Sequence, residues 1–317
     1  MNKQKTINIQ PTALVIGGHG FIGRYVVKHL QLLGAKVIVG TRHTDQKNQN
    51  NNKERQIALH KINSIEQWEA PLCNVDIVVN AVGILRQRPN ETYEKVHHHA
   101  IALLAAACTT KKIRLVHISA LGLKNQVKSR FISSKLRGEE ALKSSYADWA
   151  IVRPSLVDGN GGFGAKWFRR VAQWPVHIAP SNAKGLFAPI NVDDLGEATA
   201  RVSLQKQQEN TPEIERIYEL GGNQKVSILE HLQALRSKND KPFTITVPAI
   251  IARIVSHAFD VLHITPYSFG HYELLKQNNY PEHNRLYEVL GRPAKVIGDN
   301  SNESLPEHGH SDQVLQQ

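Results

Sequence analysis

The sequence predicts an α/β protein built on a doubly wound parallel (Rossmann) sheet, followed by a smaller C-terminal α+β subdomain. Near the start of the chain, a glycine-rich turn joins a short apolar segment to a helical pattern. Short apolar segments then alternate with helical patterns as far as about residue 155, which is typical of a parallel sheet with helices on both faces. Beyond this point the alternation becomes irregular, and the change predicts the second unit.

The glycine-rich turn lies within residues 13–33, ALVIGGHGFIGRYVVKHLQLL. Its apolar start predicts a strand, and apolar residues at helical spacing from Phe21 onward predict a helix. The glycines between them are spaced Gly17-x-x-Gly20-x-x-Gly23. A strand, a tight turn and a helix in this order form the context in which a dinucleotide pyrophosphate binds to free N–H groups at a helix N-terminus. The alternative is a glycine-rich turn without a ligand.

The second strand, expected at residues 36–40, is followed by Thr41 and Arg42. In NAD-binding proteins an acidic residue at this point binds the 2′-hydroxyl of the adenosine ribose. Arg42 instead offers a guanidinium that can pair with a 2′-phosphate, and Arg24, directly after the turn, would add a second positive charge. The sequence therefore favours NADP(H) as the cofactor and keeps NAD(H) as the alternative. In the other interpretation Arg42 only points to water.

Further elements follow in the order of the chain. The expected elements are a polar surface loop at 44–55, strands at 57–62 and 76–81, a helix at 92–110, a strand at 114–118, a helix at 129–144 and a strand at 149–152. The 92–110 helix carries apolar residues at the spacing of a sheet-facing side. It also contains His97, His98 and His99. Three consecutive histidines point in different directions around a helix, so they predict no metal site.

Residues beyond 155 mix loops, helices and short strands. The expected elements are a loop at 158–164 leading into a helix, a strand at 187–190, a capped helix from 191 to about 204, a strand at 218–222, and helices at 227–235 and 247–262. The last helix is apolar but interrupted by charged residues, which favours a lid or subdomain helix over a bilayer span. The expected organisation is an N-terminal tail (1–12), a dinucleotide-binding domain (13–155), a substrate or partner subdomain interleaved with the sheet (156–297) and a disordered tail (298–317).

Composition restricts the class of protein and its partners. The chain has 317 residues, 41% of them hydrophobic, as in a folded globular protein. Its two cysteines, Cys73 and Cys108, favour a reducing compartment over a disulfide framework, and neither a secretory signal nor a membrane-spanning run is found. The formal net charge is +11, but the basic residues are scattered. We therefore expect a solvated basic surface and no nucleic acid partner.

A set of motifs occurs in an order that resembles one family. The motifs are GGHGFIG, DIVVNAVGIL, VHISALG, RFISSKLRGEEAL, WAIVRPSLVDG and FAPINVDDLGEA. Over residues 13–295 they resemble the extended and atypical short-chain dehydrogenase/reductases, and most closely the branch that contains the NAD(P)H-binding accessory subunit of respiratory complex I and its bacterial relatives. The resemblance implies a tie to respiratory-chain or quinone metabolism and a protein or membrane-associated partner. We expect a cytoplasmic location, at or near the inner face of the membrane.

The resemblance also assigns roles to single residues. The glycine turn would wrap the pyrophosphate, Arg42 would bind the adenosine phosphate, and residues after the fourth strand would line the ribose. Together with Arg24 and Thr41, the expected cofactor-binding residues are Gly17, Gly20, Phe21, Ile22, Gly23, Arg42, Ala81, Val82, Gly83, Lys135 and Pro154. Ser119 matches the serine that ends the family's fifth strand, and in the other interpretation its hydroxyl bonds to local backbone.

One position departs from the family pattern. The tyrosine of its Tyr-x-x-x-Lys pair corresponds to Phe131, whereas the lysine is retained as Lys135. In the family the tyrosine hydroxyl exchanges a proton with the substrate oxygen, and the lysine lowers the tyrosine pKa and binds the ribose. Such acid–base help is worth about 10²–10⁴-fold in rate. Phe131 therefore predicts that tyrosine-dependent turnover is lost and that the nucleotide is structural or regulatory. Ser119 and Lys135 remain the residual catalytic candidates.

Two alternatives stay open. In the first, the protein is an active NADP-dependent reductase or a sugar-nucleotide epimerase-like enzyme in which another hydroxyl replaces that of the tyrosine. The hydroxyl groups considered are those of Tyr93, Ser133, Ser134 and Tyr146. In the second, the protein is a redox-sensing binding module whose affinity for a partner changes with the ratio of NADPH to NADP.

Overall fold

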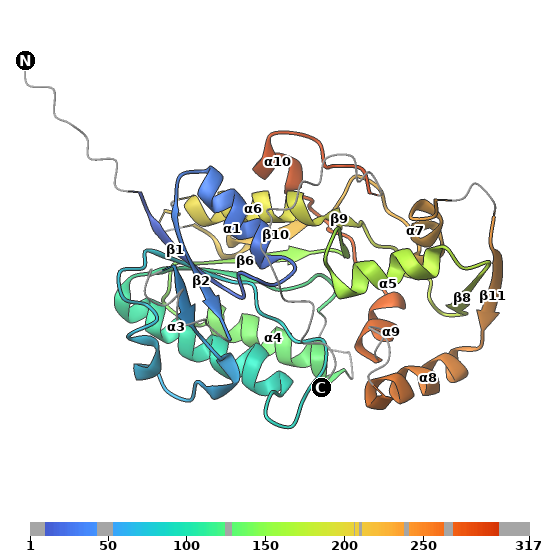
Figure 1. The fold of residues 1–317 in the computed structure, drawn as a ribbon, viewed down its shortest axis with the longest axis horizontal. Coiled ribbons are helices and arrows are strands. Elements are labelled where there is room, and N and C mark those ends of the chain that lie inside the picture. The colour runs from blue at the N-terminus through green and yellow to red at the C-terminus, as the bar shows by residue number, and fades with distance from the viewer. Residues whose placement is uncertain are drawn as a thin grey trace, which may run out of the picture.

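Seven parallel strands form the central sheet of the computed structural model, which describes residues 10–42, 53–123, 129–205, 207–208, 211–237, 241–262 and 269–297. The strands, in spatial order, are β10 (Ile217–Leu220), β6 (Trp149–Pro154), β5 (Arg114–Ile118), β4 (Ile77–Asn80), β1 (Thr12–Ile16), β2 (Lys36–Thr41) and β3 (Glu54–Gln56). The chain winds outward from β1 in both directions (Figure 1), so the predicted doubly wound sheet is confirmed. Most of the two expected tails, and most of the expected 44–55 loop, lie outside the described residues.

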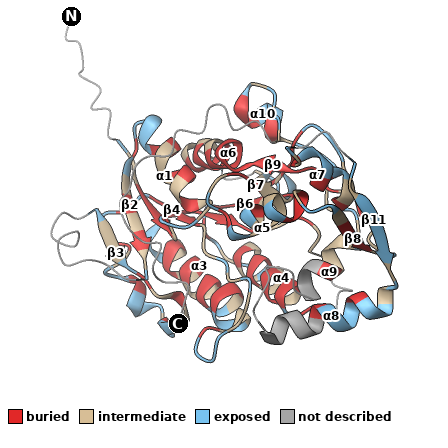
Figure 2. Cartoon of the chain, turned by 45° about the vertical axis from the view of Figure 1, so that its right-hand side comes forward, coloured by how far each residue is buried: buried red, intermediate tan, exposed pale blue. Residues whose placement is uncertain are grey.

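Helices cover both faces of the sheet. Alternate residues of β1 point to opposite faces, so Leu14 and Ile16 join one core cluster and Ala13 and Val15 the other, and all four are fully buried. Burial on both sides explains why the central strands have continuous apolar sequences. One face is covered by α1 (Gly23–Leu32), α6 (Val192–Leu204) and α10 (Leu286–Leu290), and the other by α3 (Ala100–Lys111) and α4 (Arg130–Lys143). Figure 2 shows buried residues concentrated in these layers.

The helix expected at 92–110 is present, but it begins as a π-helix. This segment, η3, spans Glu94–His99 and continues directly into α3. Short π-helical turns are rare and occur often at functional sites. His97 is turned into the interior with 3% of its surface exposed, whereas His98 lies outside and pairs with Glu94. The consecutive histidines therefore point in different directions, as expected for a helix.

The third strand does not lie where it was expected. The apolar residues at 57–62 predict a strand there, but the strand is β3, whose three polar residues pair with the end of β2. Ile57 and Leu59 instead bury their side chains from the connection that follows, and Leu59–Lys61 form a 3-10 helix, η1. A further 3-10 helix, η2, spans Glu66–Trp68. An edge strand with polar side chains is held by backbone pairing, which a hydrophobic pattern cannot reveal.

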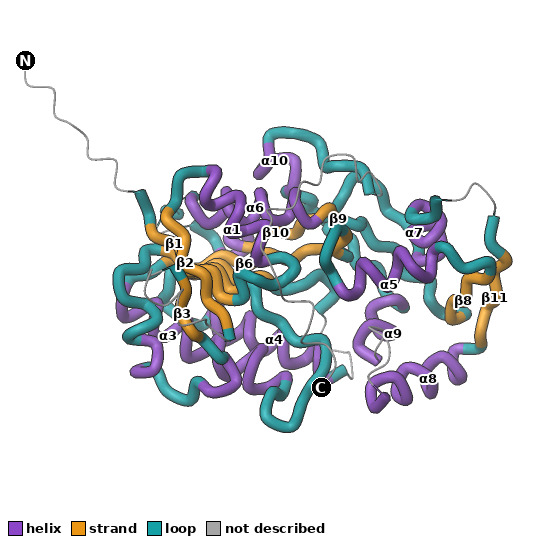
Figure 3. The backbone as a smooth tube through the Cα atoms, viewed as in Figure 1, coloured by secondary structure: helices purple, strands orange, loops and turns teal. Residues whose placement is uncertain are grey.

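The C-terminal half completes the sheet as well as forming its own unit. Its strand β10 pairs with β6, and its helix α6 packs against α1. Its other elements are β7 (Val157–Asp158), α5 (Phe163–Ala172), β8 (Val176–Pro180), β9 (Ile190–Asn191), η4 (Glu213–Arg216), α7 (Ile228–Ala234), β11 (Phe243–Val247), α8 (Ala249–Leu262) and α9 (Phe269–Leu275). Two small parallel sheets, β7 with β9 and β8 with β11, were not expected (Figure 3). The division of the chain at residue 155 stays a prediction.

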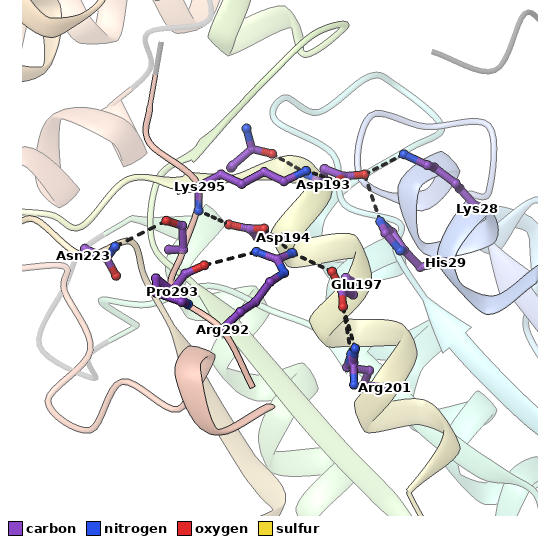
Figure 4. A network of polar contacts seen from close by, with 12 residues as sticks. Lys28, His29, Asp193, Asp194, Glu197, Arg201, Asn223, Arg292, Pro293 and Lys295 are labelled. Carbon is purple, nitrogen blue, oxygen red and sulfur yellow. Dashed lines mark hydrogen bonds and ion pairs between the residues drawn. The ribbon is translucent and has the colours of Figure 1, made fainter. Parts of the chain in front are cut away.

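A network of ion pairs joins α1, α6 and the C-terminal segment (Figure 4). Asp193 on α6 lies 2.9 Å from both Lys28 Nζ and His29 Nε2, and 2.5 Å from Lys295 Nζ. Burial alone would raise the pKa of the Asp193 carboxyl, but the hydrogen bonds from these three groups outweigh it and hold the pKa well below its usual range. The neighbouring Asp194 is fully buried and accepts a hydrogen bond from Arg292 at 2.8 Å.

We expect Asp193→Asn to lower the free energy of unfolding at pH 7 by about 2 kcal/mol, because three donors lose a shared charge. The folded-state pKa of Asp193 lies below that of the unfolded chain. Its stabilisation is therefore complete above about pH 4 and is lost as the pH falls further. Urea unfolding at several pH values measures this difference, which should shrink in acid.

The matched control is Glu213→Gln, which removes a carboxylate that is 58% exposed and pairs with Lys143. We expect it to change the free energy of unfolding by less than about 0.5 kcal/mol, as for other exposed ion pairs. Equal losses in the two variants would contradict the role given to the network.

Candidate functional site

The glycine turn lies at the carboxyl edge of the sheet, between β1 and α1. Gly17 has a φ of +79°, and its N–H donates to the Gly40 carbonyl at 2.8 Å. A Cβ on Gly23 would lie 2.1 Å from the Gly17 carbonyl oxygen, so no larger residue fits without moving the helix. The turn thereby holds the start of α1 close to the end of β1, as a dinucleotide site requires.

The start of α1 carries unused hydrogen-bond donors. The helix begins at Gly23, two residues later than the expected Phe21, and its N-cap residue Ile22 makes no side-chain cap. Within the described residues, no group accepts the N–H of Phe21, Ile22 or Gly23. Free N–H groups at a helix N-terminus bind phosphate well. These residues therefore fit the pyrophosphate of a dinucleotide.

A loop from the C-terminal half covers one side of the turn. A Cβ on Gly162 would lie 2.7 Å from the Phe21 ring, so this ring packs directly on the loop backbone. The loop is anchored by Asp158, which accepts two hydrogen bonds from Arg169 at 2.8 and 2.9 Å. Arg24 donates to the Asn160 carbonyl, and its guanidinium is therefore held at this loop. Its expected role at an adenosine phosphate stays a prediction.

Thr41 and Arg42 occupy the end of β2, next to the turn. The Thr41 carbonyl accepts the N–H of Ile57 at 2.7 Å and so fixes the strand end. Arg42 does not simply point to water, because its Nη1 lies 3.2 and 3.3 Å from the two carboxylate oxygens of Glu91. Sequence reasoning missed Glu91, which is separated from Arg42 by 49 residues and belongs to no recognised motif.

Ala81, Val82 and Gly83 form the turn after β4, beside the glycine turn. The Ala81 N–H donates to the Ile16 carbonyl at 3.0 Å, and a Cβ on Gly17 would meet the Val82 side chain at 2.8 Å. A Cβ on Gly83 would lie 3.5 Å from Lys135 Nζ. The structure thus brings the glycine turn, this segment and Lys135 together at one edge of the sheet.

Lys135 and Ser119 are buried polar groups at the same edge of the sheet. Lys135 on α4 is 8% exposed and Ser119, just after β5, is 5% exposed. Among the described residues, the Lys135 ammonium and the Ser119 hydroxyl make no side-chain hydrogen bond. Burial lowers the pKa of Lys135 to about 8, although the Glu139 carboxylate opposes this shift. An ammonium and a hydroxyl left unsatisfied at this edge fit a ligand rich in hydroxyl groups, such as a ribose.

Pro154 ends β6 at the same edge. Its carbonyl accepts the N–H of Leu121 at 3.0 Å, while the Ser119 N–H donates to the carbonyl of Val152 at 2.8 Å. The ends of β5 and β6 are therefore held together by backbone hydrogen bonds. This arrangement leaves Ser119 and Pro154 on neighbouring strand ends, where the family pattern places the nicotinamide side of the site.

Phe131 lies in a cluster of aromatic side chains beside Lys135. Its ring is 5.6 Å from the rings of both Tyr93 and His97, each in an edge-to-face arrangement, and Lys135 Nζ lies 5.8 Å from its centroid. The Tyr93 and His97 rings stack at 5.5 Å. Tyr93 thus stands close to the position of the missing tyrosine, which sequence reasoning could not place. A polar cavity of about 600 Å³, lined in part by Tyr93 and Ser133, lies beside the cluster.

His97 is held as a neutral imidazole. Its Nε2 accepts the N–H of Ile84, and its Nδ1 lies 3.0 Å from the Ser134 hydroxyl, which itself donates to the Phe131 carbonyl. The proton of the ring is therefore on Nδ1. Burial, followed by the charge of the Lys135 ammonium, holds the pKa of His97 well below its usual range. Both ring nitrogens are in use, so His97 has no proton to give to a ligand.

The other hydroxyl groups considered as substitutes are engaged or remote. Tyr93 donates to the Leu85 carbonyl at 2.8 Å, and Ser133 accepts from Arg137 at 2.7 Å. Ser134 is used between His97 and the helix backbone. Tyr146 is 96% exposed and makes no aromatic contact with the cluster. Within the described residues, no cluster of three histidine, cysteine or acidic side chains could hold a metal ion.

His117 on β5 is a second histidine that sequence reasoning passed over. It is 3% exposed, and its Nδ1 accepts from the Asn80 amide at 3.0 Å. Burial, and then the charge of Lys135, lowers the pKa of His117 to about 3, so the ring stays neutral. The Asn80 oxygen in turn accepts the N–H of Val82 at 3.2 Å. This chain of contacts fixes the turn after β4.

Comparison with known proteins agrees with this geometry. Residues 17–166 match the NAD(P)H-binding family. The mitochondrial NADH-ubiquinone oxidoreductase 40 kDa subunit of Neurospora crassa is 26% identical over 197 residues, which cover 59% of this chain and 50% of that protein. The matched part thus spans about half the length of this relative. These matches confirm the resemblance found in the sequence.

Solved structures share the fold. The triphenylmethane reductase of Citrobacter sp., complexed with NADP(H), aligns with a TM-score of 0.66 and 15% identity over 91% of this chain and 98% of that one. MoeE5, in complex with UDP-glucose and NAD, aligns with a TM-score of 0.59 and 18% identity over 90% of this chain and 94% of that one. At such identities these likenesses show the fold alone.

We expect dinucleotide affinity to fall as the pH rises through about 8, because the Lys135 ammonium then loses its proton and its positive charge. The pKa of this lysine is lowered in the folded protein, so its charged form prevails only below that value. Between pH 7.5 and pH 9.5 the dissociation constant for NADPH should rise about tenfold, as measured by fluorescence titration. The Lys135→Met variant should bind NADPH weakly at both pH values, and its dissociation constant should not change with pH. If the dissociation constant of the wild type does not change with pH, the Lys135 ammonium does not contribute to binding.

Proposed function

We propose that the protein holds an NAD(P)(H) nucleotide as a structural or regulatory group instead of turning it over; the match of residues 17–166 to the NAD(P)H-binding family supports the binding. The observation that carries the proposal is Phe131, which stands one helical turn before Lys135 and has no exchangeable proton. The glycine turn and Lys135, which would hold a nucleotide, are retained. The tyrosine hydroxyl that would exchange a proton with the substrate is absent at position 131.

The environment of Phe131 supports a binding role. A bound NADPH would supply a hydride, and reduction of a carbonyl also needs a proton at the new hydroxyl. His97 is neutral with both nitrogens engaged, and the Tyr93 hydroxyl is bonded to backbone. Lys135 and Ser119 offer a donor and a hydroxyl that suit the ribose and the nicotinamide side. Within the described residues, the site therefore fits a bound nucleotide, and neither His97 nor Tyr93 is placed to supply the proton.

NADP(H) is the form of nucleotide that we propose. The end of β2 carries Arg42 and no acidic residue, so a guanidinium stands where a 2′-phosphate would lie. The exposed fraction of the Arg42 side chain is 58%, which leaves much of its guanidinium accessible to a ligand. NAD(H) is the alternative, because relatives with this fold include a protein solved with NAD.

An active enzyme is the second candidate. The observation that favours it is the open pocket of about 600 Å³ lined in part by Tyr93 and Ser133, a size that suits a small-molecule substrate. In this candidate the pocket is intact and acts as an NADP-dependent reductase or an epimerase-like enzyme with a substitute proton donor. A redox-sensing module is the third, and it requires that NADPH and NADP differ in their effect on a partner's affinity.

An exposed apolar face supports attachment to a membrane-associated site. The face comprises Ile178 on β8, Phe243 and Ile245 on β11, and Ile250, Ile251, Ile254 and Val255 on α8. Ile250 is 70% exposed and Phe243 is 69% exposed. Among the helices of the described residues, none has the length and apolar character needed to cross a bilayer. The face therefore suits docking onto a surface.

The overall charge of the chain suits an anionic bilayer surface. The formal net charge is +11, and the segment 241–259 carries Lys241 and Arg253 between Asp240 and Asp260. Apolar side chains flanked by cations bind acidic lipid headgroups. We propose a cytoplasmic protein that docks at the inner face of the membrane. The similarity to a subunit of a respiratory oxidoreductase supports this location and a protein partner there.

To test the binding role, NADPH oxidation is measured with a panel of quinones and aldehydes. We expect no turnover by the wild type and measurable turnover, at least about 10²-fold above the wild-type limit, by Phe131→Tyr, because the variant restores the acid. Phe243→Tyr, which changes an exposed residue of β11, serves as the matched control and should remain inactive. Mass spectrometry of the nucleotide released from purified protein identifies the bound form. Robust wild-type turnover would overturn the proposal.

To test docking, cosedimentation with phosphatidylglycerol-containing vesicles is compared among variants. We expect the combined substitutions Ile250→Asp and Ile254→Asp to weaken binding at least about tenfold, since they place charge on the apolar face. The control Ile214→Asp changes a residue of η4 that is 72% exposed and should bind as the wild type does. The docking surface is refuted if the wild type does not bind the vesicles. It is also refuted if the double variant and the Ile214→Asp control weaken vesicle binding equally.

A further inference from the structure

We infer that Glu91 is a specificity-determining residue, which acts with Arg42 as a charge pair that sets the preference between NADP(H) and NAD(H). The inference rests on the proposed nucleotide-binding function and deepens it. Arg42 alone, with no acid at the end of β2, predicts a site for the 2′-phosphate. The structure shows that a carboxylate nevertheless stands at this point, supplied by a different segment of the chain.

Glu91 is delivered by a fixed turn. The turn at residues 88–91 is closed by two backbone hydrogen bonds of 3.0 Å, one from the Arg88 N–H to the Glu91 carbonyl and one in the reverse direction. The Glu91 side chain is 12% exposed and also lies 3.9 Å from the His60 ring. A carboxylate held this firmly does not swing away when a ligand arrives.

Arg42 is the adjustable member of the pair. Its backbone carbonyl accepts the Gln56 amide at 3.2 Å, which anchors the residue, but its side chain is 58% exposed. Its contacts with Glu91 run through Nη1, so the rest of the guanidinium can meet a second anion. The ion pair is part-buried on its Glu91 side and open to a ligand on its Arg42 side.

The two charges act oppositely on the two nucleotides. A 2′-phosphate pairs with the Arg42 guanidinium and is repelled by the Glu91 carboxylate beside it. A 2′-hydroxyl donates to a carboxylate, as it does to the acidic residue that ends β2 in NAD-binding proteins. Glu91 thus supplies from a distant turn the acceptor that β2 lacks. The charge pair can therefore bind either nucleotide. The relative strength of the Arg42 attraction and the Glu91 repulsion for a 2′-phosphate sets the preference between NADP(H) and NAD(H).

Calorimetric titration of the full chain with NADPH and NADH tests the inference. Relative to the wild type, Glu91→Gln should bind NADPH about fivefold more tightly and NADH about threefold more weakly, because repulsion and a charged acceptor are both lost. Arg42→Gln should shift the ratio of the two dissociation constants in the opposite direction. The control Glu213→Gln removes a carboxylate paired with Lys143 and should leave the ratio unchanged.

Two further measurements locate the effect. The fragments 2′,5′-ADP and 5′-AMP carry only the adenosine end, so they should show the same change in ratio as the whole nucleotides. Salt at about 1 M should reduce the increase in NADPH affinity caused by Glu91→Gln, because the repulsion that this variant removes is electrostatic. Thermal unfolding confirms that each variant is folded, and Arg42→Gln, which changes an exposed side chain, tests the pair if Glu91→Gln does not fold.

The possible results separate this inference from the proposed function. If the wild type binds neither nucleotide, the proposed function fails. If the wild type binds and Glu91→Gln changes both affinities equally or not at all, the nucleotide-binding function stands and the role of Glu91 is refuted. Opposite shifts for Glu91→Gln and Arg42→Gln support the charge pair.

Discussion

The approach of helix α1 to the end of strand β1 is the constraint on which the rest of the structure depends. The backbone of Gly23 meets the Gly17 carbonyl so closely that a Cβ would lie 2.1 Å from its oxygen. This contact aims the free N–H groups at the start of α1 toward the edge of the sheet. On the other side of α1, Gly196 of α6 packs against Tyr25, where a Cβ would lie 2.6 Å away. The two close contacts set α1 and α6 together, so that Asp193 reaches the basic residues of α1.

The site combines retained binding groups with an apolar wall. The Lys135 ammonium is buried beside the Phe131 ring, and this environment lowers its pKa to about 8. His97 fills the space behind the ring as a neutral group, with both nitrogens bonded. A hydrogen-bond network whose groups are satisfied is rigid. Under the proposed function, the packing that positions Lys135 also occupies both nitrogens of His97, and holding a nucleotide and reacting with it become separable properties of one fold.

Local patterns in the sequence predicted much of the fold, and long-range contacts account for what they missed. The glycine turn, the buried strands and the spacing of Phe131 and Lys135 are each contained in a few neighbouring residues. Strand β3 was misplaced because its pairing with β2 uses backbone groups of polar residues. Strands β8 (VHIAP) and β11 (FTITV) alternate in sequence, but they pair between distant segments, and β11 is exposed along most of its length. Contacts such as that of Arg42 with Glu91 depend on how distant turns meet, which composition and spacing do not encode.

The place of β10 in the sheet has a consequence for how the chain is made. This strand completes the sheet beside β6, yet it lies at residues 217–220, far beyond the end of the NAD(P)H-binding match at residue 166. As the ribosome synthesises the chain, β6 emerges with an open edge of unpaired N–H and C=O groups, which readily pair with other chains. At about 5–20 residues per second, the edge stays open for several seconds until β10 follows. The sheet is therefore complete only after the C-terminal half has been synthesised, and until then the edge of β6 is open to pairing with another chain.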